Sequence, residues 1–209
     1  MILDFFTSES ITSLIKLTGY LGVWAIIFSE TGLLIGFFLP GDSLLFISGF
    51  LASQGFFNVW LMAGGIFLFA VLGDSVGYAF GNKTGPMIFK KQDSLLFHKK
   101  NLIKAQNFYE KYGAMTIVLA RFIPIIRTFA PIVAGIGKMD YKKFLVFNIF
   151  GGFIWSLGVT LAGYFLPKIF PETEKYLTLI IFSIIFISLI PPISQFLKEY
   201  FQNNKKTPE

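Results

Sequence analysis

Apolar residues in this chain come in long, nearly uninterrupted runs. Residues 57–73, 144–167 and 177–197 each approach the ~20 apolar residues that a helix needs to cross a ~30 Å hydrocarbon layer. A soluble domain of this size has little use for several such runs. The pattern therefore predicts an all-α integral membrane protein with three full transmembrane helices.

Two further apolar stretches, residues 20–53 and 112–137, are too short or too broken for ordinary membrane crossings. Two crossings need about 40 residues and a turn, whereas residues 20–53 provide 34. Both stretches contain proline. Proline favours a break in a helix, because it removes a helical hydrogen bond and clashes with the preceding turn. We therefore predict two re-entrant helical hairpins. The residues that break them are Pro40, Gly41, Pro124 and Pro131.

The distribution of lysines sets the predicted orientation. Residues 82–111 contain seven lysines, and the short turn at residues 138–143 contains three. Because positive loops favour the cytoplasm, both segments should lie there, so residues 112–137 must enter the membrane and return. The first hairpin then enters from the outer face. The N-terminus is expected outside and the C-terminus in the cytoplasm.

The chain divides into three regions by composition. Residues 1–19 form an interfacial amphipathic segment, with apolar residues at helical spacing over residues 8–18. Residues 20–166 form the membrane domain, which includes the basic cytoplasmic loop 82–111. Residues 167–209 contain the C-terminal transmembrane helix and a cytoplasmic tail.

A short internal repeat relates the two hairpins. The sequence FLPGDS at residues 38–43 is similar to FIPIIR at residues 122–127, and Gly77 and Gly163 are each followed by tyrosine. The first proline precedes the Gly-Tyr pair by 37 residues in one half and by 39 in the other. Two like units that enter from opposite faces form an inverted repeat, a layout common in secondary transporters.

Ionisable side chains within the hairpins are the candidate functional groups: Glu30, Asp42, Arg121 and Arg127. A charge at the bilayer centre costs roughly 2.5–3.5 kcal/mol on insertion scales. The chain can tolerate four such charges if opposite charges meet or line a wet cavity. Since the acids lie on one hairpin and the arginines on the other, we expect the hairpins to meet through them.

Each residue type suggests a role. An arginine fork grips phosphate through two parallel hydrogen bonds, so Arg121 and Arg127 are candidate head-group ligands. A buried carboxylate can take up and release a proton, so Glu30 and Asp42 are candidates for proton coupling and gating. Two alternatives stay open: the arginines only lock the hairpins together, or they snorkel to the cytoplasmic interface.

A helix with regularly spaced glycines precedes the basic loop. Gly73, Gly77, Gly81 and Gly85 recur at four-residue spacing, which predicts close helix packing. Asp74 lies among them, near the inner end of its span, and is interpreted as an interfacial or packing residue rather than a proton carrier.

Several chemistries have no residues to support them. The absence of cysteine excludes thiol nucleophiles and cysteine-ligated metals. The lone histidine, His98, lacks partners for a zinc site or a serine triad. We therefore expect no enzyme, metal or cofactor. The net charge of +6 comes mostly from lysines outside the apolar runs, which suits anionic lipid head groups better than nucleic acid.

Three motifs are specific enough to indicate a family. They are ETGLLIGFFLPGDSLLFISGFLA from Glu30, GDSVGYAFGNKTG from Gly73, and ARFIPIIRTFAPIVAGIGKMDYKKFLVFNIFGGFIWSLGVTLAGY from Ala120. Together they resemble the DedA family of bacterial membrane proteins, part of the SNARE-associated or VTT-domain group. The resemblance covers roughly residues 20–166, whereas residues 177–209 match no motif of the family.

The resemblance implies a lipid translocase or scramblase of the bacterial cytoplasmic (inner) membrane. Some family members recycle undecaprenyl phosphate, and others are tied to phosphatidylethanolamine movement or proton-dependent homeostasis. The family's important acids and arginines fall on the four residues already named. The leading prediction is a proton-coupled flippase for undecaprenyl phosphate, whose partners are a phosphorylated membrane lipid and protons or sodium; a homo-oligomer is allowed. The alternatives are a phosphatidylethanolamine translocase or scramblase, a proton-coupled small-cation exporter, and a non-transporting scaffold.

Overall fold

The computed structural model describes residues 8–33, 41–88, 113–177, 179–180 and 183. Within these ranges the regular structure is helical and contains no β-strand, as the sequence predicts. The helices in chain order are α1 (Ser8–Gly32), α2 (Gly41–Ser53), α3 (Val59–Ile88), α5 (Met115–Ala120), α6 (Pro124–Ile136) and α7 (Tyr141–Ile169), followed by the 3-10 helix η3 (Pro171–Glu174).

Three segments are long and apolar enough to cross a membrane: Ser10–Gly32, Val59–Gly85 and Tyr141–Ile169. The last two confirm the predicted central spans, and the chain is a multi-pass membrane protein. The first was expected to belong to a hairpin instead. The span predicted at residues 177–197 lies almost entirely outside the described residues.

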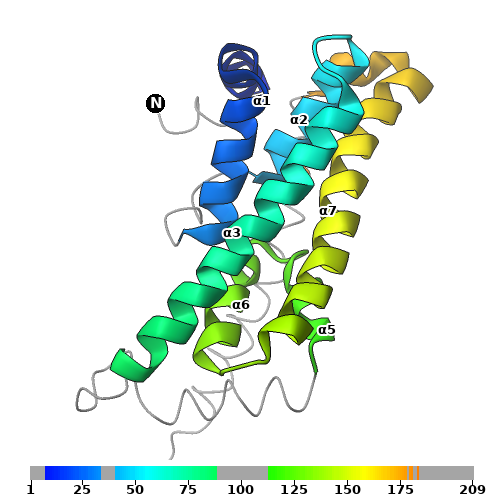
Figure 1. Cartoon of the computed structure of the whole chain (residues 1–209). Coiled ribbons are helices and arrows are strands. Elements are labelled where there is room, and N and C mark those ends of the chain that lie inside the picture. Colours follow the sequence, from blue (N-terminus) through cyan, green and yellow to red (C-terminus); the bar gives the residue numbers. More distant parts are fainter. Residues whose placement is uncertain (1–7, 34–40, 89–112, 178, 181–182, 184–209) are drawn as a thin grey trace, which may run out of the picture.

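Helix α1 bends at Gly19. This glycine has φ 61° and ψ −154°, a backbone conformation that residues with a Cβ rarely adopt. The part of α1 before the bend is seen nearly end-on in Figure 1, whereas the rest runs along the bundle. The predicted boundary of the amphipathic segment falls at this residue, whose non-helical backbone separates the two helical parts that together are called α1. The 13 residues after Gly19 rise about 20 Å, less than the ~30 Å hydrocarbon layer.

Each short helix packs along a long helix from the other half of the chain. Helix α2 lies against α7, and α6 lies against α3 (Figure 1). Glycines permit this close approach. A Cβ on Gly49 or Gly163 would strike the facing backbone between α2 and α7, and a Cβ on Gly81 or Gly135 would do the same between α3 and α6.

The helix pairs α1–α2 and α5–α6, each made of helices consecutive in the sequence, open toward opposite ends of the bundle. In Figure 1, α1 and α2 connect to the rest of the chain at the upper end, and α5 and α6 do so at the lower end. Pro124 begins α6 as predicted, and Gly41 begins α2. Pro40 lies outside the described residues.

Two predicted boundaries are wrong in detail. Pro131 lies inside α6 rather than at a break. Its missing N–H costs one hydrogen bond, but α6 is held along α3. The proline packs beside Gly77, where an added Cβ would lie in ordinary contact, 3.5 Å from the Pro131 Cβ. Helix α3 also continues to Ile88, so the first residues of the predicted loop 82–111 are helical.

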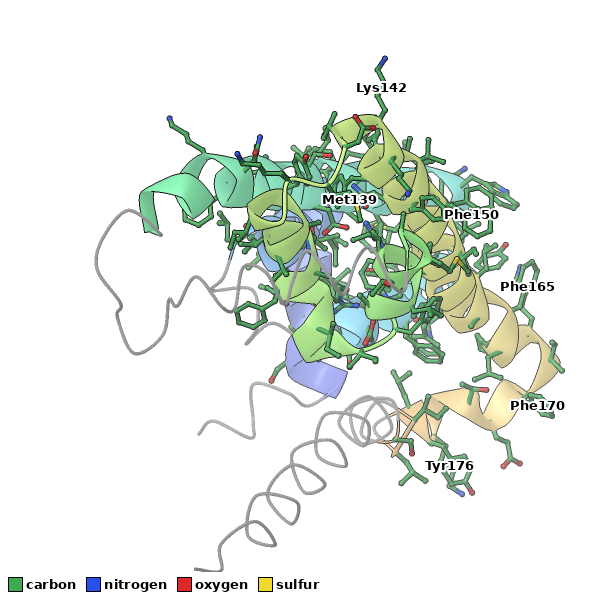
Figure 2. All side chains as sticks on the ribbon, turned by 90° about the horizontal axis from the view of Figure 1, so that it is seen from below. Met139, Lys142, Phe150, Phe165, Phe170 and Tyr176 are labelled. Atoms are coloured by element: carbon green, nitrogen blue, oxygen red, sulfur yellow. The ribbon has the colours of Figure 1, made fainter. Side chains whose placement is uncertain are left out.

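Apolar side chains both fill the interior and cover the outside. Ile27, Leu45 and Met62 form part of a fully buried core between α1, α2 and α3. Large apolar residues on α7 also point outward, including Phe150 and Phe165, which Figure 2 shows directed away from the helices. Contiguous exposed apolar surface of this kind suits contact with lipid.

Candidate functional site

Arg127 of α6 joins the two helix pairs at the centre of the bundle. Its Nη1 donates a hydrogen bond to Oδ1 of Asp42 at 2.9 Å, and its Nη2 donates to Oε1 of Glu30. Both contacts are ion pairs. Arg127 is 85 residues from one acid and 97 from the other, so the fold brings these three predicted site residues together.

The local sequence explains why two acids gather here. Asp42 lies in the first turn of α2, where the positive end of the helix dipole favours a carboxylate. Glu30 lies near the end of α1, and its carboxylate lies where a Cβ on Gly41 would be. Gly41 therefore permits the approach of Glu30 to the start of α2.

Trp155 of α7 completes the Arg127 cluster, which consists of Glu30, Asp42, Arg127 and Trp155. The indole Nε1 of Trp155 donates to Oδ1 of Asp42 at 2.7 Å. The Arg127 guanidinium lies 4.4 Å from the centroid of the Trp155 ring, within cation–π range. The sequence analysis did not identify Trp155, although a tryptophan inside an apolar run needs a partner for its N–H when buried.

Arg121 lies in a second cluster, where it pairs with a different acid. Its Nη2 donates to Oδ2 of Asp74 on α3 and to Oδ1 of Asn148 on α7. Asn148 in turn donates through Nδ2 to the carbonyl oxygen of Val71 at 3.1 Å. Asp74, Arg121 and Asn148 are all buried, and they are called the Arg121 cluster below.

Asp74 is thus buried and paired with Arg121. The sequence was interpreted as giving it an interfacial or packing role; its burial rules out the interfacial role, and the ion pair was not predicted. The available signal was an acid inside an otherwise apolar helix, which requires a counter-charge. Because Glu30 and Asp42 already balance the two arginines in number, counting charges gave no reason to include a third acid.

Several buried polar atoms in both clusters have no hydrogen-bond partner among the described residues. They are Glu30 Oε2, Asp74 Oδ1, Arg127 Nε, and Arg121 Nε and Nη1. A buried polar atom without a partner costs about 1–3 kcal/mol, so these atoms favour water, a proton or a polar ligand. No group of three metal-ligating side chains occurs within the described part of the chain.

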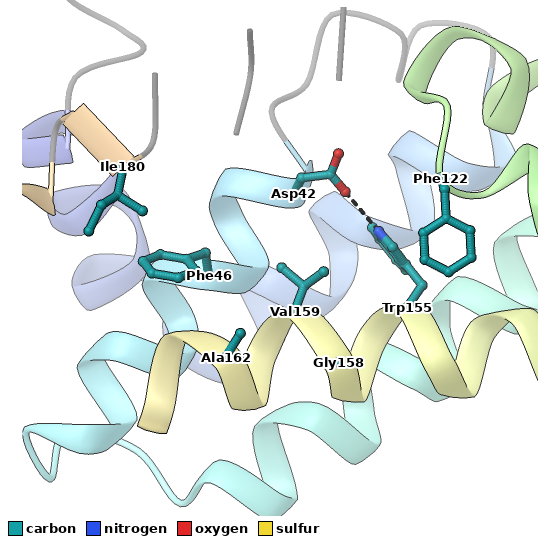
Figure 3. A pocket seen from close by; sticks show the side chains of 8 residues that line it. All are labelled: Asp42, Phe46, Phe122, Trp155, Gly158, Val159, Ala162 and Ile180. Atoms are coloured by element: carbon teal, nitrogen blue, oxygen red, sulfur yellow. Dashed lines mark hydrogen bonds between the residues drawn. The ribbon is translucent and has the colours of Figure 1, made fainter. Parts of the chain in front are cut away.

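A cavity of about 410 Å³ adjoins the Arg127 cluster (Figure 3). Asp42 connects the two, because its side chain is 19% exposed whereas those of Glu30 and Arg127 are 2% and 3% exposed. We call it the Asp42 cavity, and the residues lining it are Asp42, Phe46, Phe122, Trp155, Gly158, Val159, Ala162 and Ile180.

Comparison with known proteins identifies the family. The VTT domain model matches residues 39–165. An uncharacterized membrane protein of Mycobacterium leprae is 46% identical over 168 residues, 80% of this chain and 75% of the relative. Protein DedA of Escherichia coli is 42% identical over 193 residues, 88% of each chain. Inner membrane protein YghB of Escherichia coli is 32% identical over 150 residues, 72% of this chain and 68% of the relative.

No solved structure matches the chain. The family match nevertheless spans more than half of the sequence and includes Asp42, Asp74, Arg121 and Arg127. It extends from just before α2 to the last part of α7, so it covers both of the helix crossings described above. The chain belongs to the DedA family of VTT-domain membrane proteins.

Proposed function

We propose that the protein is a lipid transporter, a proton-coupled flippase that returns undecaprenyl phosphate across the bacterial cytoplasmic membrane. The observation that carries this proposal is Arg127, buried between two acids where the helix pairs meet and next to a cavity that reaches Asp42. The arginine supports an anionic head group. The choice of lipid rests on the resemblance to the family.

In this proposal, α1–α2 and α5–α6 are re-entrant hairpins of an inverted repeat, and the N-terminus lies outside. Their connection to opposite ends of the bundle supports this arrangement (Figure 1). So does the length of α1 after Gly19, which is too short to cross the hydrocarbon layer by itself.

Charge balance supports the coupling to protons. Glu30 and Asp42 engage both terminal nitrogens of Arg127, so a phosphate must displace them. Protonation of both acids weakens these contacts and leaves the guanidinium fork available for phosphate. A phosphate dianion that arrives with two protons leaves the net charge of the site unchanged. The head group then avoids the cost of burying additional charge in the membrane.

Arg121 remains a candidate second ligand for the phosphate. Two of its nitrogens make no hydrogen bond among the described residues. The Trp155 ring lies near both guanidinium groups, 5.9 Å from Arg121 and 4.4 Å from Arg127. A head group at Trp155 would thus be within reach of both arginines after a small rearrangement.

Translocation in proteoliposomes tests the proposal. Polyprenyl phosphate is included in the vesicles, and its head group is followed by its accessibility to a phosphatase added outside. We expect transport by the full chain, faster under an imposed pH gradient, and a rate for Arg127→Ala no higher than that of protein-free vesicles. Lys168→Ala is the control, since Lys168 is exposed and its ammonium group bonds to the Tyr164 side chain away from both arginine clusters. Wild-type transport by Arg127→Ala would refute the role of Arg127.

The same vesicles separate the rival functions. Preferential movement of labelled phosphatidylethanolamine, or of a cationic dye, would replace the proposed substrate by one of these. A non-transporting scaffold predicts that the double variant Asp42→Arg with Arg127→Asp keeps its function, because the ion pair is preserved. Transport requires the guanidinium at its own position and should not survive this exchange.

A further inference from the structure

The Asp42 cavity is polar at one end and apolar along the rest of its length. Figure 3 shows Asp42, Trp155 and Phe122 at one end and Phe46, Ala162 and Ile180 at the other. Its volume of about 410 Å³ falls in the range of roughly 300–1,000 Å³ typical of small-ligand sites. A ligand that matches this lining has one charged end and an apolar body.

Small residues of α7 keep the apolar part of the cavity open. Gly158 and Ala162 line it and are exposed. A Cβ built on Gly158 would meet no atom within 4 Å. Neighbouring glycines of α7 differ: Gly163 faces the backbone of α2, and Gly152 faces Arg121. Helix packing therefore accounts for Gly152 and Gly163 but not for Gly158, whose missing side chain leaves space in the cavity.

The cavity continues directly from the Arg127 cluster. Oδ1 of Asp42 accepts hydrogen bonds from both Arg127 and Trp155, and Asp42 also lines the cavity. Asp42 and Phe46 are four residues apart, so they lie on one face of α2. The step from the charged end to the apolar wall is therefore one helical turn, about 6 Å.

We infer that the Asp42 cavity binds the first part of the hydrocarbon chain of a lipid whose phosphate is held at Arg127. This inference rests on the proposed function and specifies where the hydrocarbon chain of its substrate binds. One turn of helix between charge and apolar wall suits a phosphate attached directly to a single chain. A glycerophospholipid would place a glycerol and a second chain in this short interval. Along α7 the cavity extends from Trp155 to Ala162, a length of about 10 Å along the helix axis that the hydrocarbon chain of the lipid would occupy.

Filling the cavity tests the inference. Gly158→Leu introduces a side chain into open space, and leucine favours helix over glycine. The matched control is Gly64→Leu on α3, an exposed glycine whose added Cβ also meets nothing within 4 Å and which does not line the cavity. We expect the translocation rate of polyprenyl phosphate to fall about tenfold in Gly158→Leu, the loss expected for displacing about two buried methylenes, and to stay unchanged in Gly64→Leu.

Competing inhibitors distinguish binding of the hydrocarbon chain from binding of the phosphate head group. A short prenyl phosphate should inhibit Gly158→Leu about tenfold less strongly than wild type. Methyl phosphate, which has no chain, should inhibit both proteins equally because Arg127 is unchanged. Ala162→Phe, at the far end of the cavity, is the second variant and should give the same pattern if Gly158→Leu does not fold.

The outcomes distinguish this inference from the proposed function. If both cavity variants transport polyprenyl phosphate like wild type while Arg127→Ala does not, the hydrocarbon chain of the lipid binds elsewhere and the proposed function stands. If Arg127→Ala also transports like wild type, the proposed function fails and the inference with it. Equal loss of inhibition by methyl phosphate and prenyl phosphate would also overturn the inference, because the substitution would then act on the head-group site.

Discussion

Trp155 has a double role at the scale of single residues. Its N–H donates to Asp42, and its ring lies against the Arg127 guanidinium. It also forms part of the wall of the Asp42 cavity. The indole therefore fixes the position of the acid that reaches the cavity, and it shields the arginine next to it from lipid.

Trp155→Phe should reduce transport while the protein stays folded. Phenylalanine keeps an aromatic ring beside Arg127 but removes the donor to Asp42, a loss of about 1–3 kcal/mol for a buried hydrogen bond. We expect a several-fold lower rate of polyprenyl phosphate translocation in proteoliposomes. Trp60→Phe is the control, since Trp60 is 62% exposed on α3. Equal rates for the two variants would show that the hydrogen bond to Asp42 does not matter.

Asp74→Asn should destabilise the protein strongly, because it leaves the guanidinium of Arg121 buried without its counter-charge. Breaking one side of a buried ion pair costs about 3–5 kcal/mol. We expect a lower melting temperature in detergent, and a partial recovery in Asp74→Asn with Arg121→Gln, which removes both charges. A double variant less stable than Asp74→Asn would contradict this account of the Arg121 cluster.

The sequence identified the charged residues of the two hairpins and predicted that acids and arginines would meet, but it did not predict the pairing of Arg121 with Asp74. Glu30, Asp42, Arg121 and Arg127 were identified because a charge inside an apolar segment needs a partner. Several pairings satisfy that requirement equally well. The choice of Asp74 for Arg121 depends on where α3, α5 and α7 cross, which no local pattern specifies.

At the scale of helices, glycines determine which surfaces meet. The predicted packing face of α3 includes Gly81, where a Cβ would strike the backbone of α6. On α7, Gly163 is in the corresponding situation against α2. These two crossings hold the short helices, and with them Asp42 and Arg127, at their observed positions.

Gly163→Ala should therefore separate α2 from α7 and lower the melting temperature, since the added methyl group meets the Phe46 carbonyl oxygen. Gly158→Ala, five residues earlier on the same helix, adds its methyl group to open space. It should be neutral or stabilising by up to about 1 kcal/mol, the helix-propensity gain of alanine over glycine. Equal melting temperatures would show that the crossing does not need the glycine.

The sequence predicted helix breaks better than helix lengths. Pro124 begins α6 as expected, because proline has no N–H to donate and fits the first turn. The predicted boundary after residue 19 likewise coincides with a break, since the non-helical backbone of Gly19 separates the two helical parts of α1. Pro131 shows the opposite case, in which contacts with a neighbouring helix keep a helix continuous through a proline.

At the scale of the whole molecule, the proposal depends on two helix pairs that enter the membrane from opposite faces. In this arrangement the ion pairs between Arg127 of one pair and the acids of the other lie within the membrane. The lysine distribution predicted this arrangement, because the segments on either side of α5 and α6 are both basic. The alternative is that residues 112–137 cross the membrane once, which would place the two basic segments on opposite faces.

Cysteine labelling in intact cells tests this arrangement most directly, because the chain contains no native cysteine. Lys83 near the end of α3 and Lys142 at the start of α7 are exposed and precede and follow the α5–α6 pair. Phe56 in the α2–α3 turn and Lys175 just after η3 are also exposed, and these segments lie at the other end of the bundle (Figure 1). We predict that a membrane-impermeant maleimide labels Phe56→Cys and Lys175→Cys but reaches Lys83→Cys and Lys142→Cys only after the cells are opened. Labelling of Lys83→Cys and Lys142→Cys from opposite faces would contradict the account.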